Sequence, residues 1–268
     1  MTAMKSIPGS LRPAAGRCLT LATIVLLGLL VALWPRLSLS ERLFLGLSVF
    51  LAHLSILAGT VWSCSGWFAP VVRRFSPSGK EVWLTLDDGP HPRFTVQTME
   101  VLARHDARAT FFVIGREADH NPELLRAMTE AGHGLGNHTH SHPYRTCWCR
   151  PRWWLGRDVD RCTRVIEQAT GEKPALFRAP VGMASPATGS VVAARSLRLI
   201  GWSVRGIDAK FGSPEVIAER VLRQVRPGAI ILMHPERRPE SVAALDMVLA
   251  GLSKRGYRCV IPNPRQFA

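Results

Sequence analysis

The stretch EVWLTLDDGP, residues 81–90, contains the pattern on which the fold prediction rests. Apolar and β-branched residues from 82 to 86 predict a buried strand, and Asp87 and Asp88 follow it directly before a Gly-Pro turn. A turn with an Asx cap explains a DG pair taken alone. Two adjacent acids at the end of a buried strand, however, need a compensating positive charge. This turn is therefore the first candidate for a functional site.

Short apolar runs of the same kind recur along the rest of the chain. They cover residues 109–114, 133–137, 175–177, 198–202, 229–233 and 258–261. Segments with helical periodicity separate them, and two of these segments open with Asn-Pro-Glu or Ser-Pro-Glu start signals. Regular alternation of this kind predicts parallel β/α units, and seven strands are about enough to close a barrel. The sequence therefore predicts an α/β fold, a distorted (β/α) barrel of about seven parallel strands; a doubly wound open sheet is the alternative.

Polar residues fall where these predicted strands end. Besides the two acids, they are His138, Arg178, Asp208 and His234. The carboxyl ends of the strands of a parallel barrel open on one face, where barrels of this type carry their chemistry. The positions of these residues therefore favour a barrel over an open sheet and predict a single site.

The stretch GNHTHSH, residues 136–142, is the strongest metal signal in the chain. His138 and His142 are four residues apart, and with a carboxylate they form a His2Asp set that leaves zinc an open position for water. A histidine-rich surface loop is the alternative. Arg178 in FRAPVG and His234 in IILMHP are, taken singly, typical of a surface ion pair and a polar cap. Together on one barrel face, these residues predict an active site.

The N-terminal part of the chain has a different composition. Residues 18–34 and 43–62 form two apolar runs without a charged side chain, and each predicts a membrane-spanning helix. The second run is long enough for a hydrocarbon core of about 30 Å and the first is marginal. A cleavable signal peptide is the alternative for the first run, but it has no good small-x-small cleavage site.

This division predicts four parts and a multi-pass, membrane-anchored protein of a bacterial-type inner or plasma membrane. A basic tail covers residues 1–17, the two helices lie within 18–64, a linker with proline and glycine covers 65–79, and the folded domain covers 80–268. Basic residues flank both apolar runs, so the side of the membrane on which the domain lies stays open.

The chain is strongly basic, with 34 Lys and Arg against 20 Asp and Glu and a net charge of +14. Such a surface suits anionic lipid headgroups or a phosphate-bearing substrate. No stripe of basic residues interleaved with aromatic ones marks a nucleic-acid binder, and no obligate protein partner is evident. The six cysteines have no CxxC spacing, which argues against a disulfide framework. Cys147 and Cys149 are compatible with a metal site but are more typical of an inert loop.

From about residue 81 to its C-terminus, the chain resembles the polysaccharide deacetylases that share the NodB homology domain, a family similar to carbohydrate esterase family 4. TLDDGP, HTHSH, RAPVG, WSVRGID and LMH match the five motifs of that family in order, and ATFFVIG resembles a further family segment. The resemblance implies a hydrolase that removes N-acetyl groups from an amino sugar in a polysaccharide, an oligosaccharide or a lipid-linked glycan.

The resemblance also implies roles for individual residues. It assigns the metal, usually zinc, to Asp88, His138 and His142, although this ligand set also accepts cobalt, nickel or manganese. It makes Asp87 the general base that activates water and His234 the general acid that protonates the leaving amine.

Supporting roles follow from the same resemblance. Arg178 is expected to keep Asp87 anionic, and Asp208 to orient His234. The backbone N–H of Val181 is expected to stabilise the oxyanion, with Pro180 and Trp202 beside the substrate.

Two departures from the family pattern concern the substrate. Val181 stands where the family often has Tyr, and Ala209 where it often has Trp, so aromatic surface is missing from the expected acyl or sugar pocket. Trp148, Trp153 and Trp154 are core residues, or they stack on a sugar or rest at a membrane interface. A deformylase or deacylase of a lipid-linked or small non-polymeric amide is the alternative function. A catalytically silent membrane protein that uses the barrel for binding is a further one.

Overall fold

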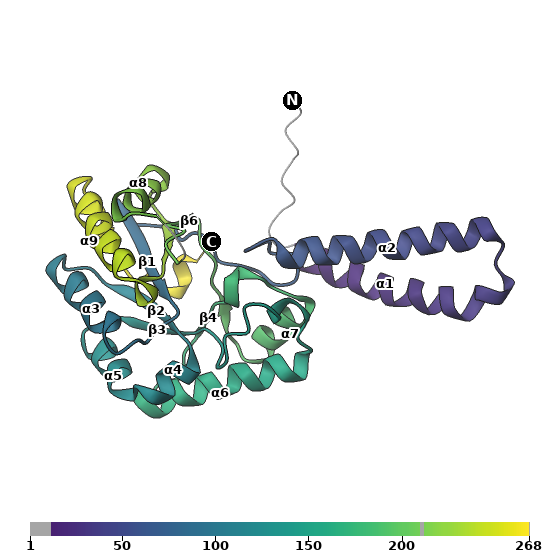
Figure 1. Ribbon diagram of the computed structural model, residues 1–268, viewed down its shortest axis with the longest axis horizontal. Coiled ribbons are helices and arrows are strands. Elements are labelled where there is room, and N and C mark those ends of the chain that lie inside the picture. The colour runs from purple at the N-terminus through teal and green to yellow at the C-terminus, as the bar shows by residue number, and fades with distance from the viewer. Residues whose placement is uncertain (1–11, 210–211, 268) are drawn as a thin grey trace.

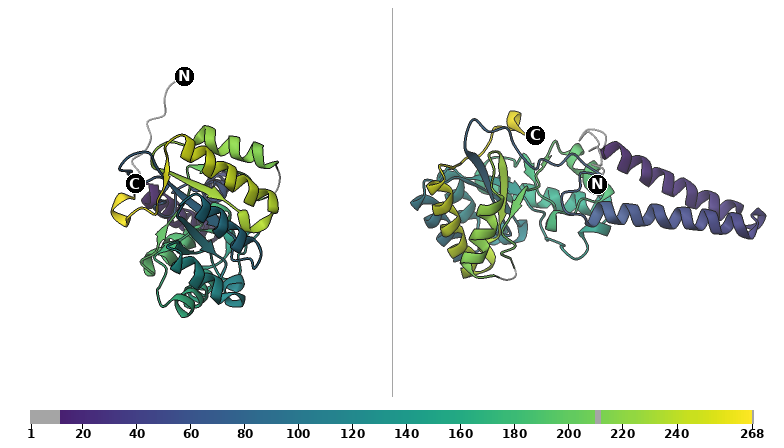
Figure 2. Two further views of the ribbon diagram at one scale, coloured as in Figure 1. Left: turned by 90° about the vertical axis from the view of Figure 1, so that its left-hand side faces the viewer. Right: turned by 90° about the horizontal axis from the view of Figure 1, so that it is seen from above.

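A computed structural model gives the structure of residues 12–209 and 212–267. Most of the predicted basic tail, residues 1–11, lies outside the described residues. The described chain consists of a globular α/β part and a hairpin of two long helices that projects from one side of it (Figures 1 and 2).

The hairpin covers both apolar runs. Helix α1 (Arg12–Leu33) leads through a 3-10 turn, η1 (Trp34–Arg36), into α2 (Leu39–Val61), and the two helices lie side by side. A capping box between Ser38 and Glu41 begins α2. Both helices are long and apolar enough to cross a membrane. Most of their side chains are exposed rather than packed into the globular part, which distinguishes them from core helices.

The globular part is built on a single parallel sheet. Its strands are β1 (Glu81–Asp87), β2 (Ala109–Val113), β3 (Gly134–Asn137), β4 (Leu176–Phe177), β5 (Arg198–Leu199), β6 (Val204–Arg205), β7 (Ala229–Met233) and β8 (Arg258–Cys259). They are ordered β5-β4-β3-β2-β1-β7-β6, and β8 pairs with the start of β1. From β1 the order follows the chain through β5 on one side, and β7 and β6 lie on the other side. This is the order of a curled barrel with a seam between β5 and β6, and it differs from the reversed order of a doubly wound sheet.

Seven of the eight strands fall on the predicted apolar runs, and β6 was missed. Its two residues, Val204 and Arg205, form no apolar run, so nothing local marks them as a strand. They join the sheet because they pair with Ile231 and Leu232 of β7.

Seven helices cover the outside of the sheet. They are α3 (Phe94–Arg104), α4 (Gly115–His120), α5 (Pro122–Glu130), α6 (Arg152–Thr170), α7 (Pro186–Ala194), α8 (Pro214–Gln224) and α9 (Pro239–Lys254). Both predicted start signals begin helices, at Pro122 and Pro214.

Strand β1 is buried along its whole length, and its side chains alternate between two environments. Val82, Leu84 and Leu86 pack in the large core beneath the helices, whereas Trp83 packs in the barrel interior. The side chains of Thr85 and Asp87 follow the same alternation toward the interior. The period of two thus directs the last acid of the strand into the barrel.

The post-hairpin segment, residues 62–75, includes much of the predicted linker, and it packs onto the domain. Phe68, Ala69 and Phe75 are buried, and Val72 pairs with Ile200 next to β5. Two residues further on, Arg74 pairs with Ala229 of β7, so the segment crosses the seam of the sheet. The sequence analysis predicted a linker here because of the proline and glycine residues, and it did not predict these apolar contacts.

The substitution Gly189→Ala in α7 tests this packing. We expect it to destabilise the folded protein by about 2 kcal/mol, because the added methyl group would overlap the segment. A Cβ at Gly189 would lie 2.0 Å from the backbone oxygen of Phe68, and this overlap outweighs the roughly 1 kcal/mol that Ala gains over Gly in a helix. Thermal unfolding of the purified chain measures the effect. Gly79→Ala is the control, because nothing lies within 4 Å of its Cβ position. Equal midpoints for the two variants would contradict the packing described here.

Candidate active site

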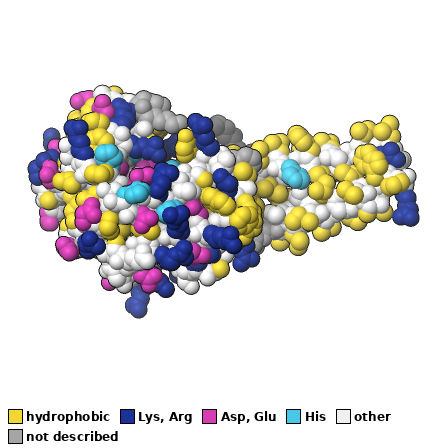
Figure 3. Space-filling view, turned by 60° about the horizontal axis from the view of Figure 1, so that its bottom comes forward, with side chains coloured by type: hydrophobic (Ala, Val, Ile, Leu, Met, Phe, Trp, Pro, Cys, Tyr) yellow, Lys and Arg dark blue, Asp and Glu magenta, His cyan; other side chains and the backbone are white. Residues whose placement is uncertain are grey.

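The polar residues predicted at strand ends converge at the carboxyl edge of the sheet. Asp87 ends β1, His138 follows β3, Arg178 follows β4, Asp208 lies beyond β6 and His234 follows β7. Histidine, acidic and basic side chains lie close together on the domain face seen in Figure 3. Short distances join Asp87, Arg178, Asp88, His138 and His142, and the charges of Asp87 and Asp88 act on His234, which Asp208 holds.

The buried pair of Asp87 and Arg178 forms the floor of the site. The Arg178 guanidinium donates to four acceptors: Asp87 Oδ1 at 2.7 Å, Thr85 Oγ1 at 2.9 Å, Ile200 O at 3.2 Å and Gly201 O at 2.9 Å. Three of these acceptors are neutral, so the charge of the guanidinium is left to stabilise the Asp87 carboxylate. The other oxygen of Asp87, Oδ2, lies 3.7 Å from His138 Nε2.

Asp88, His138 and His142 form a set of converging ligand atoms. Asp88 Oδ1 lies 3.2 Å from His142 Nε2 and 3.5 Å from His138 Nε2, and all three atoms lie within 4.8 Å of one another. Ligands about 2.0–2.1 Å from one tetrahedral ion are separated by about 3.3 Å, which these spacings approach. Asp88 Oδ1 is buried and has no hydrogen-bond partner among the described residues. An orphaned carboxylate oxygen facing two imidazole nitrogens fits a divalent cation.

The surroundings of the two histidines also suit metal binding. His138 Nδ1 lies 2.9 Å from the carbonyl oxygen of Arg178, and because a carbonyl only accepts, Nδ1 carries the proton and Nε2 keeps its lone pair. Burial and the neighbouring His138 lower the pKa of His142 to about 3, so its ring is neutral near pH 7. Burial would raise the pKa of Asp88, but its contact with His138 and the charges of the other histidines lower it well below its usual range.

Two residues that the sequence analysis did not single out support this set. Arg237 Nε donates to Asp88 Oδ2 at 2.6 Å, so one oxygen of the ligand is held while the other faces the histidines. Glu236 is buried, accepts a hydrogen bond from the Thr95 hydroxyl and lies next to Gly89. Burial raises the pKa of Glu236 to about 7. The only signal in the sequence was the charged run ERR directly after His234 and its proline.

We expect Arg237→Ala to weaken zinc binding about tenfold, because partners that orient a metal ligand typically contribute 10- to 100-fold in affinity. Competition with a chromophoric chelator measures the dissociation constant without any assay of activity. Arg238→Ala is the matched control, because Arg238 lies next in the chain and pairs with Glu240 instead. Unchanged affinity in Arg237→Ala would show that Asp88 needs no such support.

On the opposite side of the site, His234 is held by Asp208. The backbone N–H of His234 donates to Asp208 Oδ2 at 2.6 Å, and His234 Nδ1 lies 3.1 Å from Oδ1. Burial would lower the pKa of His234, but the hydrogen bond and charge of Asp208 raise it above its usual value, and the charges of Asp88 and Asp87 act in the same direction. A ring that is oriented in this way and keeps its proton has the properties of a general acid.

A short turn, η3 (Pro180–Gly182), begins two residues after Arg178. Its central residue, Val181, has φ +49°, a left-handed conformation that is rare for a β-branched residue. Gly182 also has positive φ, and a Cβ there would lie 2.4 Å from the Trp202 ring, so this close approach requires glycine. Trp202 therefore lies behind the turn, and its ring also lies over the Arg178 guanidinium, 5.7 Å from Cζ.

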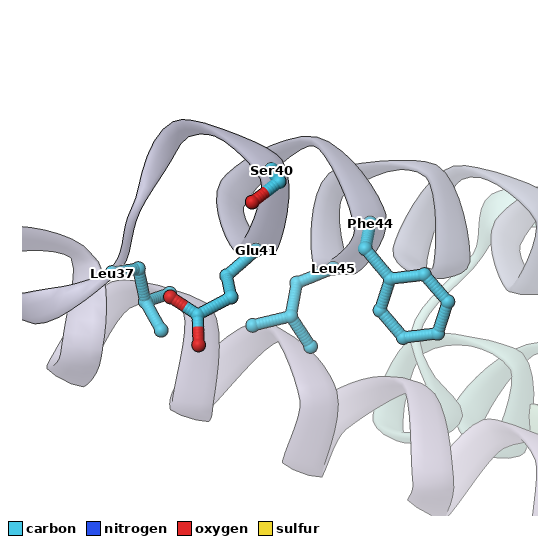
Figure 4. Close-up of a pocket in the computed structure, with 5 residues that line it drawn as sticks. All are labelled: Leu37, Ser40, Glu41, Phe44 and Leu45. Carbon is cyan, nitrogen blue, oxygen red and sulfur yellow. The ribbon is translucent and has the colours of Figure 1, made fainter.

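Other features of the described chain do not form a second site of this kind. A pocket between the hairpin helices is lined by Leu37, Ser40, Glu41, Phe44 and Leu45 (Figure 4). Its one acid, Glu41, already accepts hydrogen bonds from Ser38 as the helix cap. Of the three tryptophans near the metal loop, Trp154 packs partly against the core, Trp153 is exposed, and the side chain of Trp148 lies outside the described residues.

The chain is similar to known proteins both in sequence and in fold. The family model described as polysaccharide deacetylase matches residues 75–200. The chain is 37% identical over 203 residues to a chitooligosaccharide deacetylase of Sinorhizobium fredii, a match that covers 69% of this chain and 92% of that relative.

Solved structures give the same result at the level of the fold. A family 4 carbohydrate esterase from Streptomyces lividans, in complex with acetate, superposes with a TM-score of 0.65 at 30% identity, covering 70% of this chain and 96% of that one. A protein from Bacillus anthracis described as a CE4 family pseudoenzyme has a TM-score of 0.64 at 30% identity, with 70% and 65% covered.

The sequence match extends over nearly the whole of the Sinorhizobium relative, and the five motifs meet at one edge of a sheet that superposes on solved members. The chain therefore belongs to the polysaccharide deacetylase family, and it is a hydrolase of carbon–nitrogen bonds other than peptide bonds.

Proposed function

We propose that this protein removes the N-acetyl group from an amino sugar of a glycan, with the help of a divalent cation, zinc. The observation that carries the proposal is the combination of three units on one barrel face. They are the Asp87–Arg178 pair, the ligand set around Asp88 and the His234–Asp208 pair.

Asp87 has the surroundings of a general base. It lies next to the ligand set, and Arg178 donates to its Oδ1, so its other oxygen, Oδ2, can accept a proton from water that attacks the acetyl carbonyl. When bound by Asp88, His138 and His142, the cation would polarise the carbonyl and lower the pKa of water. The N–H of Val181 in η3 would add a hydrogen bond to the oxygen on which negative charge develops.

His234 completes the reaction as the general acid. Its proton-bearing ring would donate to the departing nitrogen, which leaves as a free amine together with acetate. Asp208 contacts both the backbone N–H and the ring Nδ1 of His234, and it favours the protonated form of the ring. The base and the acid thus come from different strand ends. The base lies beside a positive charge and the acid beside a negative one, an arrangement that supports acid–base catalysis near neutral pH.

We propose a membrane-associated, lipid-linked glycan as the substrate, because of the helical hairpin. The hairpin surface is mostly apolar or uncharged, with basic side chains at its far end (Figure 3), as expected of a two-helix membrane anchor. The η3 turn contacts the chain two residues beyond the end of α2, so such an anchor would hold the site near the membrane surface. The net charge of +14 agrees with an anionic surface or a phosphate-bearing lipid as a neighbour.

Hydrolysis of another acyl group, such as a formyl group, on a lipid-linked or small substrate is the second candidate. The same residues would perform it, and the absence of an aromatic residue at Val181 and at Ala209 favours a pocket unlike that of better-known members. A silent binding protein is a weaker candidate, although one structural relative is described as a pseudoenzyme, because every ligand and both acid–base residues are present here.

Amine release by the detergent-purified full chain tests the proposal. The panel comprises N-acetylglucosamine oligomers, a lipid-linked acetylated sugar and the formylated form of each, with and without a chelator. Chelator-sensitive release from an acetylated substrate is expected, with the lipid-linked one preferred. Release from formylated sugars alone would select the second candidate, and no release by metal-loaded protein would favour a binding role.

A further inference from the structure

The post-hairpin segment contacts the turn η3, which begins two residues after Arg178. The Ser63 hydroxyl donates to the carbonyl oxygen of Val181 at 2.9 Å, and the Cys64 backbone N–H donates to the carbonyl oxygen of Gly182 at 2.9 Å. The first of these bonds joins residues 118 positions apart in the sequence. Two successive residues beyond α2 therefore hold two successive carbonyls of the turn.

The turn needs such support because its backbone is strained. Val181 is β-branched and lies in the left-handed region, a strained conformation that persists only where the surrounding structure imposes it. Within η3, the Gly182 N–H donates to Ala179 and the Met183 N–H donates to Pro180. The bonds from Ser63 and Cys64 come from outside the turn and fix the direction of its peptide groups.

Ser63 is itself held in place by packing on both sides. Cys64 is buried, and a Cβ at Gly201 would lie 2.7 Å from its sulfur. On the hairpin side, Trp67 is so close to both helices that a Cβ at Gly59 would lie 2.7 Å from its ring and one at Gly16 would lie 2.1 Å from its backbone oxygen. The segment is thus fixed between the hairpin and the domain, and it can transmit a defined position to η3.

We infer that Ser63, two residues beyond α2, is a positioning residue for hydrolysis. This inference rests on the proposed function, in which the N–H of Val181 faces the developing oxyanion. A hydrogen-bond donor of this kind is effective only when it is held in place before the reaction. The carbonyl of Val181 belongs to the residue that carries this N–H, so the hydroxyl of Ser63 restricts rotation of that residue.

Ser63→Ala in the full chain is expected to lower kcat about tenfold and to leave KM unchanged. The reason is that the N–H of Val181 would stabilise the charge that develops in the transition state and contribute little to binding of the substrate itself. Ser63→Thr keeps the hydroxyl and is expected to restore most of the rate. Hydrogen exchange of the backbone amides of residues 178–184 is expected to be faster in Ser63→Ala, with zinc affinity and the unfolding midpoint unchanged.

Ser65→Ala is the matched control. Ser65 lies in the same segment, but its hydroxyl donates to Gly59 in the last turn of α2, and within the described residues it forms no hydrogen bond with η3. Its kcat and the exchange at residues 178–184 are expected to match those of the unsubstituted chain.

The outcomes separate this inference from the proposed function. If the unsubstituted chain releases amine and Ser63→Ala retains kcat within twofold, the inference is wrong and the proposed function stands. Equal losses in Ser63→Ala and Ser65→Ala would also overturn it, because they would indicate general loosening of the segment. If no substrate of the panel is hydrolysed by metal-loaded protein, the proposed function fails and the inference falls with it.

Discussion

Asp87→Asn is expected to lower kcat for amine release by roughly 10³-fold while metal binding is retained, in line with the usual contribution of a general base. The amide has the shape of the carboxylate and still offers an oxygen to Arg178, whose Nη1 now lies 2.7 Å from Asp87 Oδ1. It cannot accept the proton of the attacking water. Rates are measured by amine release under saturating substrate, and metal content is measured on the same samples.

Asp246→Asn is the control for this prediction. Asp246 also forms ion pairs, with Arg104 and His105, but it lies on α9 away from the carboxyl ends of the strands. Its activity is expected to be unchanged. If Asp87→Asn retained a tenth or more of the parent rate with full metal content, another group would have to serve as the base.

Removal of a metal ligand is expected to have an effect of similar size through a different cause. His142→Ala deletes one of the three ligand atoms that lie within 4.8 Å of one another, and activity is expected to fall below detection. The parent chain is expected to lose its activity in the same way after dialysis against a chelator. Zinc content measured by elemental analysis should fall from one equivalent to nearly none.

His140→Ala is the matched control for metal content. His140 lies between the two ligands in HTHSH but does not belong to the ligand set, so the variant is expected to keep one equivalent of zinc. Zinc at 100 times its dissociation constant should also stabilise the parent chain by about 2.7 kcal/mol, seen as a higher unfolding midpoint. Full zinc content in His142→Ala would contradict the ligand assignment.

Much of the fold was predictable because its signals are local. The runs that became β1, β2 and β7 are apolar segments five to seven residues long whose ends carry polar residues, and periodicity alone locates such strands. The start signals at Pro122 and Pro214 act within one helical turn. β6 was missed because Val204 and Arg205 form no apolar run, and they join the sheet through their pairing with β7.

The candidate site divides in the same way. Some of its residues form local patterns that predict their chemistry. They are the adjacent acids Asp87 and Asp88 and the His-x3-His spacing of the metal loop. Arg237 and Ser63 carry no such signal, because an arginine in a charged run and a serine near an apolar helix are ordinary surface residues.

The sequence by itself determined the order of strands and helices, the apolar hairpin and the residue types that can bind a metal and move protons. Only the tertiary structure decided that Arg237 holds Asp88, that Ser63 holds Val181 and that residues 62–75 cross the seam of the sheet. The physical reason is range. Periodicity, capping and turn chemistry act between near neighbours, whereas a hydrogen bond between residues 118 positions apart depends on how the whole barrel packs.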